Sequence, residues 1–194
     1  YVSLYAKADG KLYSKDDAGA ETLVSSAPAT TKQLYVANFK PTLTNGAADS
    51  AQIEMGTNKN VYDYLAFDAS SIEYAYANVP MPSDWDASTV TATFYWLHPA
   101  TATNFGVVWG LQGVAMANDD PLDVAQGTVQ TVADTGGTTS DLYISAATSA
   151  MTIAGSPAAG EYVQFRVQRT ATDGSDTMTV DAYLLGALIT YGVT

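Results

Sequence analysis

The clearest alternation of apolar and polar residues in this chain lies between Glu161 and Tyr191. It has a period of two, first over residues 162–168 and again over residues 177–184. This period is typical of strands with one buried face. A short loop at Asp173-Gly174 separates the two runs, so the pattern predicts a long antiparallel hairpin with one buried face. The residues expected on that face are Val163, Phe165, Val167, Met178, Val180, Ala182 and Leu184.

Beyond Leu184 the alternation breaks, and the second face of the strand becomes apolar as well. The residues responsible are Leu185, Ala187, Ile189 and Tyr191. Gly186 stands where a β-bulge can redirect a strand. A strand that is apolar on both faces needs cover on both, from a second sheet together with either a loop or another subunit. We interpret it as an oligomer interface that includes Leu185, Ile189 and Tyr191.

The first 24 residues contain a near-repeat, in which Leu4-Tyr5-Ala6-Lys7 returns eight residues later as Leu12-Tyr13-Ser14-Lys15. Turn signals at Asp9-Gly10 and Asp17-Ala18-Gly19 predict a meander of three short strands. Such a unit is too small to hold a core alone. We therefore expect copies of the chain or a docking partner to complete it, through Leu4, Tyr5, Leu12 and Tyr13. The alternative is a frayed terminal hairpin.

The polar, proline-containing segment Ser25–Lys32 predicts a boundary between a meander at residues 1–27 and a larger domain at residues 28–194. About ten strand signals follow at short intervals, without helical periodicity between them. Thr89–Leu97 is the cleanest of these strands. In Phe105–Val114, glycines opposite the apolar face indicate close packing of another segment or a ligand groove. The predicted fold is all-β, an antiparallel jelly-roll or β-sandwich preceded by a small N-terminal β-meander.

Composition narrows the functional classes. The chain has 194 residues, of which 47% are hydrophobic and 14% charged, against about 25% charged in typical domains. Residues 61–194 hold two arginines and 14 acidic residues, which gives this part a net charge of −12. Such a body repels phosphate backbones, so we expect no nucleic-acid partner. We also expect no membrane insertion, because no apolar run is long enough to cross a bilayer, and no thiolate zinc site, because cysteine is absent.

The candidate chemistry is sparse. His98 is the single histidine, and neither a nucleophile elbow nor a cysteine accompanies it. Asp84 and Asp86 flank Trp85, but paired carboxylates are common in turns, so we expect no catalytic residue, no cofactor and no enzyme. The turn Asn118–Asp123 offers weak calcium candidates in Asp119, Asp120 and Asp123, although it lacks the spacing of a calcium-binding loop.

Thirteen tyrosines and three tryptophans suit interfaces or stacking on sugars. Tyr62, Tyr64, Tyr74 and Tyr76 are expected on two neighbouring strands, each pair on one face. We expect a core or inter-subunit role for them, with a glycan platform as the alternative.

The segment LYAKADGKLYSKDDAGAE, Leu4–Glu21, resembles a motif near the start of domains in bacteriophage tail-fibre and other virion structural proteins. The segments NFGVVWGLQGVAM, DLYISAATSAMTIAG and RVQRTATDGSDTMTVDAYLLGALITY are similar to a β-rich domain of phage structural proteins. The resemblance implies a trimeric fibre or decoration element on the capsid or tail surface of a virion, attached to other virion proteins through its N-terminal segment. The chain departs from the resemblance in having no Gly-X-Y repeat and no heptad shaft. It also has no long β-helix of the kind found in glycan-degrading tailspikes, which disfavours a depolymerase.

Two functional hypotheses follow. The first is a non-enzymatic, homotrimeric virion protein whose loops around Trp85, His98 and Asp119–Asp123 contact a host surface, including its glycans. The second is a carbohydrate-binding module of a secreted or surface protein. Binding of glycans by a monomer would favour the second hypothesis, and a stable trimer lost on deletion of residues 1–30 would favour the first.

Overall fold

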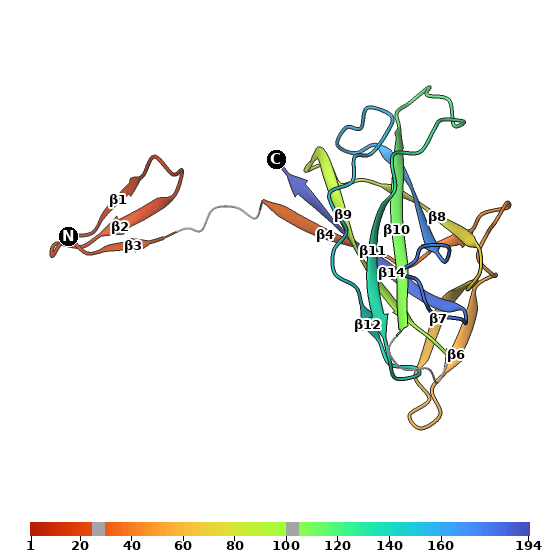
Figure 1. The fold of residues 1–194 in the computed structure, drawn as a ribbon. Coiled ribbons are helices and arrows are strands. Elements are labelled where there is room, and N and C mark those ends of the chain that lie inside the picture. Colours follow the sequence, from red (N-terminus) through yellow and green to blue (C-terminus); the bar gives the residue numbers. More distant parts are fainter. Residues whose placement is uncertain (25–29, 100–104) are drawn as a thin grey trace.

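The structure, a computed structural model, describes residues 1–24, 30–99 and 105–194 (Figure 1). The described residues form strands and turns but no helix, so none of them makes a helix that is long and apolar enough to cross a membrane. The predicted fold class is confirmed, because the chain is an antiparallel β-sandwich preceded by a small β-meander.

The meander is a three-stranded antiparallel sheet of β1 (Ser3–Ala6), β2 (Leu12–Lys15) and β3 (Glu21–Leu23), in that order. Among the described residues, no hydrogen bond or ion pair joins residues 1–24 to the rest of the chain. The predicted domain boundary between residues 27 and 28 lies outside the described residues.

Two antiparallel sheets make up the sandwich, and we name them the β10 sheet and the β14 sheet after one of the long strands in each. The β10 sheet has the order β11-β10-β13-β8-β5. Its strands are β5 (Lys40–Pro41), β8 (Ile72–Pro80), β10 (Phe105–Met116), β11 (Gln130–Gly136) and β13 (Tyr162–Thr170). The β14 sheet has the order β12-β9-β14-β7-β6, and β4 also pairs with β14. Its strands are β4 (Thr31–Val36), β6 (Ala51–Glu54), β7 (Val61–Phe67), β9 (Trp85–Leu97), β12 (Tyr143–Ile144) and β14 (Ala182–Val193).

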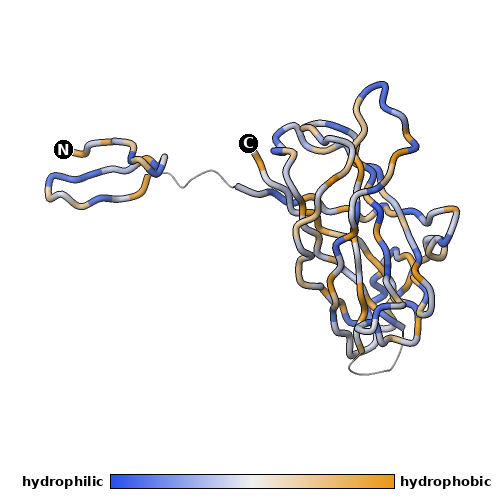
Figure 2. The backbone as a smooth tube through the Cα atoms, turned by 45° about the horizontal axis from the view of Figure 1, so that its top comes forward, coloured by the Kyte–Doolittle hydropathy of each residue, from blue (hydrophilic) through white to orange (hydrophobic). Residues whose placement is uncertain are grey.

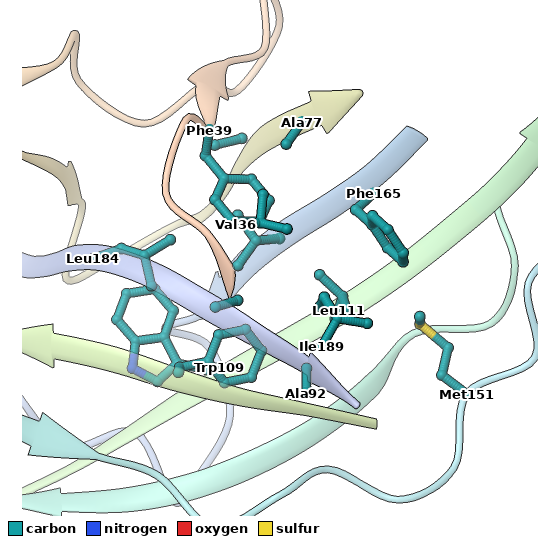
Figure 3. Close-up of a cluster of buried hydrophobic side chains, with 14 of the residues drawn as sticks. Val36, Phe39, Ala77, Ala92, Trp109, Leu111, Met151, Phe165, Leu184 and Ile189 are labelled. Atoms are coloured by element: carbon teal, nitrogen blue, oxygen red, sulfur yellow. The ribbon is translucent and has the colours of Figure 1, made fainter. Parts of the chain in front are cut away.

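The core lies between these sheets and is centred on Trp109, which is fully buried (Figure 3). The Phe67 ring meets it edge-on at 5.2 Å between centroids, and the Phe94 ring stacks on it at 5.9 Å. Phe67 and Phe94 come from the β14 sheet and Trp109 from the β10 sheet, so the aromatic rings join the two layers. Figure 2 shows hydrophobic and hydrophilic stretches interleaved along the strands, as expected where each strand has one buried face.

The predicted C-terminal hairpin is wrong, because its two arms belong to different sheets. β13 lies in the β10 sheet and β14 in the β14 sheet, and residues 171–181 cross between them. The predicted faces are nevertheless correct, since Val163, Phe165 and Leu184 are all buried in the shared core. A period of two identifies the buried face of a strand but not its hydrogen-bonded partner.

A buried ion pair anchors this crossing. Arg169 Nε and Nη2 donate to the two carboxylate oxygens of Asp176 at 3.0 and 2.8 Å, and both side chains are fully buried. The guanidinium also donates to the carbonyl oxygens of Phe67, Val180 and Met178 at 3.1, 2.8 and 2.7 Å. The pair, which we call the crossing clasp, therefore ties β13 to the crossing segment and to the end of β7.

The doubly apolar strand is also explained within one copy of the chain. The pairing of β14 with β9 shifts register between Leu184 and Gly186, which is a β-bulge. The extra residue reverses the parity of the strand, so Leu184 before the bulge and Ile189 after it enter the same core (Figure 3). Ile189 and Tyr191 are 0% and 5% exposed. The prediction that they form an oligomer interface is therefore wrong.

The four regularly spaced tyrosines do not lie on neighbouring strands, as the sequence had indicated. β7 belongs to the β14 sheet and β8 to the β10 sheet. The turn between them is held by Asp68, whose Oδ1 accepts from the backbone N–H groups of Ser70 and Ser71 at 2.7 and 2.9 Å. Each pair of tyrosines does share a face, and that face points away from the core in both sheets. The pairs are Tyr62 and Tyr64 on β7, and Tyr74 and Tyr76 on β8.

Candidate functional site

A pocket of about 580 Å³ opens on the outer face of the β14 sheet, beside the bulge. On one edge, β14 pairs first with β7, over Ala182–Leu184, and then with β4, over Ala187–Gly192. The pocket lies where the chain passes from one partner to the other, and we call it the tyrosine pocket. Its lining residues are Tyr35, Ala37, Met55, Val61, Tyr62, Asp63, Tyr95, Leu97, Ser140, Asp141, Leu142 and Leu185.

Three tyrosines give the pocket its aromatic character. The rings of Tyr35 and Tyr95 meet edge-on, with centroids 5.5 Å apart and an interplanar angle of 89°. Tyr35 and Tyr62 are 49% and 42% exposed, so each presents part of its ring to solvent. Leu97 is buried beneath them, and the side chain of Leu185 borders the same space. Aromatic and aliphatic carbon thus forms most of the surface that a ligand would contact.

The bulge and Tyr35 depend on each other. Tyr35 Oη donates to the carbonyl oxygen of Leu185 at 3.3 Å. A Cβ atom at Gly186 would lie 2.6 Å from Tyr35 Oη and 2.7 Å from the carbonyl oxygen of Val36. Only glycine therefore fits beneath the tyrosine. Burial raises the pKa of the Tyr35 phenol, and Tyr95 raises it further, so the phenol stays protonated at neutral pH and keeps its hydrogen-bond donor.

The polar groups of the pocket are acceptors and hydroxyls. Asp63 Oδ1 accepts from Gln52 Nε2 at 2.8 Å, which fixes the carboxylate and leaves its second oxygen available. Asp141 and Ser140 approach from the opposite loop. Among the described residues, no lysine or arginine pairs with either aspartate. A largely apolar cavity with a few oriented polar groups is typical of small-molecule sites. The carboxylates on the rim of this pocket can accept hydrogen bonds from hydroxyl groups of a ligand.

Two residues predicted to contact a ligand do not reach solvent. Trp85 is 1% exposed and His98 is 0% exposed. Trp85 begins β9 rather than lying in a loop, so its ring enters the core. His98 packs edge-on against Phe105 at 4.6 Å between ring centroids and stacks on Tyr143 at 5.6 Å. The prediction of a contact role for these two residues is therefore wrong.

Two aspartates of the turn Asn118–Asp123 accept hydrogen bonds from residues of the turn itself or next to it. Asp120 Oδ2 accepts from the backbone N–H of Ala117 at 2.8 Å, and Asp119 Oδ2 accepts from Asn118 Nδ2 at 2.7 Å. Within residues 1–24, 30–99 and 105–194, no group of three or more histidine, cysteine or acidic side chains is placed to hold a metal ion. Asp119, Asp120 and Asp123 thus do not form the calcium site considered from the sequence.

The other predicted interface residues fall in two places. Leu185 lines the tyrosine pocket, where it is partly exposed. Leu4 and Leu12 share one face of the meander and are 64% and 37% exposed. Tyr5 and Tyr13 pair on the opposite face, with ring centroids 6.2 Å apart. The meander therefore has one aromatic, internally bonded face and one aliphatic face.

Sequence reasoning missed Tyr35 and Tyr95. The alternation in Thr89–Leu97 assigns Tyr95 to the outer face, and Tyr35 has the outward parity in its own strand. The sequence did indicate a bulge at Gly186. What it did not show is that β4 pairs with β14 beside this bulge, which brings the rings of Tyr35 and Tyr95 together.

Comparisons with known proteins give distant likenesses only. No protein-family model matches the chain, and no curated protein matches it. Among solved structures, it is similar to a CBM35 from Cellvibrio japonicus Abf62, at 11% identity and a TM-score of 0.44, covering 84% of this chain and 94% of that one. A second structure is described as addressing the promiscuous specificity of carbohydrate-binding modules from the β-sandwich superfamily. It gives 12% identity and a TM-score of 0.30, covering 100% of this chain and 74% of that one. At such values the function has to be argued from the chain's own residues.

Proposed function

We propose that this chain is a non-catalytic, carbohydrate-binding β-sandwich and that the tyrosine pocket holds the sugar. The observation that carries the proposal is the arrangement of Tyr35, Tyr62 and Tyr95 around one cavity of about 580 Å³. Sugar rings have apolar C–H faces that stack on aromatic rings and hydroxyls that need hydrogen-bond partners at the edges. The pocket supplies both, through its three rings and through Asp63, Asp141 and the tyrosine hydroxyls.

The negative charge of the tyrosine pocket limits which saccharides it can bind. Asp63 and Asp141 lie on its rim, and none of the described residues that line it is a lysine or an arginine. A carboxylated or sulfated sugar would meet like charge there. Neutral hydroxyl-rich saccharides are therefore the expected ligands, with their hydroxyls donating to the two carboxylates.

Titration of the full chain with neutral oligosaccharides, chosen from a glycan array, tests the proposal. Replacing Tyr62 by Ala removes one wall of the pocket and should weaken binding roughly tenfold. Tyr162→Ala is the matched control, because Tyr162 is 44% exposed, close to the 42% of Tyr62, and does not line the pocket. The proposal fails if no neutral saccharide binds, or if both variants weaken binding equally.

The meander supports a second candidate, a virion structural protein assembled from several copies. Its aliphatic face exposes Val2, Leu4, Leu12 and Val24 by 70%, 64%, 37% and 51%. The opposite face is internally bonded, through the ion pair of Lys7 with Glu21 and the hydrogen bond of Tyr5 to Glu21. A lone three-stranded sheet is marginal in water, so cover of the aliphatic face by neighbouring copies, as in a trimeric fibre, would stabilise it.

Native mass spectrometry separates these candidates. A fibre protein should be trimeric with residues 1–24 and monomeric without them, and Leu4→Ser together with Leu12→Ser should also give monomers. Lys15→Ser is the control, since Lys15 lies on the opposite face of the meander. A full chain that is monomeric at micromolar concentration would exclude the trimer. Glycan binding that survives removal of residues 1–24 would support the carbohydrate-binding function regardless of assembly state.

A further inference from the structure

We propose that the outer face of the β10 sheet carries a second binding site, which takes an anionic saccharide bearing a carboxylate or a sulfate group. This site is separate from the tyrosine pocket, which lies on the other sheet. That its ligand is a saccharide rests on the proposed function. That the ligand is an anion rests on the charges and contacts of this face alone.

The site consists of two hollows that share Tyr76, with volumes of about 580 and about 210 Å³. We call them together the amide groove. The first is lined by Thr42, Leu43, Thr44, Asn45, Tyr74, Tyr76, Gln164 and Arg166. The second is lined by Asn38, Lys40, Tyr76, Ala77 and Asn78. Within the described part of the chain, these linings hold two cationic side chains and no aspartate or glutamate, although the net charge of the whole sequence is −12.

Arg166 is held in place while part of its guanidinium stays available. Its Cζ lies 4.7 Å from the centroid of the Tyr74 ring, a cation–π arrangement. With the Gln112 amide oxygen turned toward it, Arg166 Nε and Nη2 donate to that oxygen at 2.6 and 2.5 Å, and the Gln112 nitrogen donates to the carbonyl of Gly127 at 3.0 Å. Arg166 Nη1 donates to no acceptor within the described part of the chain. The contacts with Tyr74 and Gln112 therefore fix the orientation of the Arg166 guanidinium and leave Nη1 available to a ligand.

The other arginine of this sheet shows what a purely structural role looks like. Arg169, three residues further along β13, is fully buried and donates to Asp176 and to three backbone carbonyls. Arg166 is partly exposed and, among the described residues, pairs with no carboxylate. A planar guanidinium matches a carboxylate or sulfate with two parallel hydrogen bonds. An external anion would thus pair with Arg166 as Asp176 pairs with Arg169.

A row of amides continues the site along the sheet. Gln126 Nε2 donates to Gln164 Oε1 at 3.1 Å, and Gln164 Nε2 donates to Asn78 Oδ1 at 3.1 Å. This relay fixes the orientation of Asn78, whose own amide N–H groups have no acceptor within the described residues. Lys40 is exposed and lies opposite Tyr76 in the β5–β8 pairing. The groove therefore presents an arginine, an amide, a tyrosine ring and a lysine to one ligand, which suits an anionic sugar with hydroxyl groups beside its charge.

Titration of the full chain with D-glucuronate, glucose 6-sulfate and glucose tests this inference, with NMR chemical shifts or calorimetry as the readout. At least one of the two anions should bind more tightly than glucose at the groove, and its binding should weaken with added salt. Binding of glucuronate alone would identify a carboxylate site, and binding of the sulfate alone a sulfate site. Equal binding of glucose and both anions would overturn the inference.

Two groove variants and two controls locate the binding. Arg166→Met should weaken binding of the anion roughly tenfold, and Lys40→Gln roughly threefold. Lys59→Gln removes an exposed lysine outside the groove and should change nothing. Tyr62→Ala should weaken neutral saccharides only, so failure of one site leaves the other testable. If Arg166→Met unfolds the protein, Lys40→Gln tests the inference instead, because Lys40 is exposed. Anion binding that is unaffected by Lys40→Gln would then overturn the inference.

Discussion

The two outer faces of the sandwich use the same aromatic residue in opposite electrostatic settings. Tyr62 on β7 lies beside Asp63 and Asp141, whereas Tyr76 on β8 lies beside Lys40 and Arg166. The tyrosine pocket and the larger hollow of the amide groove each have a volume of about 580 Å³. A net charge of −12 for the chain therefore does not determine the preference of each site, since the few side chains within a Debye length of a ligand dominate its electrostatic energy.

The faces also differ in how they are built. The amide groove lies on β8 and β13, whose pairing runs from Tyr162 to Thr170 without a register shift. The tyrosine pocket depends on an irregularity, the bulge of β14 at Gly186. A regular ladder places neighbouring side chains by the geometry of the strands. The geometry of the tyrosine pocket depends on one residue, Gly186. A single substitution there should therefore remove the tyrosine pocket and leave the amide groove.

The largest effect is expected at the crossing clasp, which supports both faces at once. Asp176→Asn removes the charge that balances the buried Arg169, and loss of one partner of a buried pair costs about 3–5 kcal/mol. We expect the free energy of unfolding in urea to fall by that amount and both sites to be lost together. Asp181→Asn, an exposed change at the end of the same crossing, should be nearly neutral. Retention of full stability by Asp176→Asn would show that the clasp does not hold the layers.

A smaller and one-sided effect is expected from Gly186→Ala. The added Cβ would lie 2.6 Å from Tyr35 Oη and 2.7 Å from the Val36 carbonyl oxygen, and such overpacking costs about 1–3 kcal/mol. Neutral-saccharide binding at the tyrosine pocket should be lost while anion binding at the amide groove remains. Gly174→Ala is the matched control, because no atom lies within 4 Å of its added Cβ. Equal loss at both sites would refute the independence of the two faces.

The smallest effect is expected at the turn from β7 to β8, and it depends on pH. Hydrogen bonds from Ser70 and Ser71 lower the pKa of Asp68 from 3.8 to about 2. Because the pKa is lower in the folded chain, ionised Asp68 contributes stability above about pH 4, and this contribution disappears as the pH falls to about 2. Asp68→Asn should therefore be less stable than the wild type at pH 5 and equal to it near pH 2.

Thermal unfolding between pH 2 and pH 5 measures this difference, with the exposed Asp49→Asn as control. A gap between wild type and Asp68→Asn that stays constant with pH would contradict the assignment. Neither binding site should respond to this substitution, because Asp68 lines neither cavity.

The buried face of each strand could be predicted from the sequence, but the strands with which it pairs could not. Phe165 and Leu184 were assigned to the buried face, and both are buried. Of the two alternatives left open for the glycines of Phe105–Val114, Gly106 shows close packing of another segment, since a Cβ there would lie 2.1 Å from the carbonyl oxygen of Ser175. Alternation depends on one strand and its core, so local sequence encodes it. The sheet to which β13 or β14 belongs depends on contacts between distant segments, which no local pattern encodes.

The candidate sites were harder to predict for the same reason. Trp85 and His98 were expected in surface loops, yet β9 begins at Trp85 and both rings are buried. The residues that do line cavities are drawn from strands far apart in the chain, as with Tyr35 and Tyr95. Their proximity follows from the pairing of β4 and β9 with β14, so it appears only once the topology is known.

The register shift at Leu184/Gly186 also limits how this chain can change its length. Deleting one residue there would restore an uninterrupted ladder, but it would also turn the whole C-terminal half of β14 over, exposing Ile189 to water and burying Thr190. A loop can lose a residue at little cost. Loss of one residue at this bulge would instead exchange the buried and exposed faces of β14 in all the residues that follow it. The single additional amino acid is what lets two differently phased halves of one strand occupy the same interior.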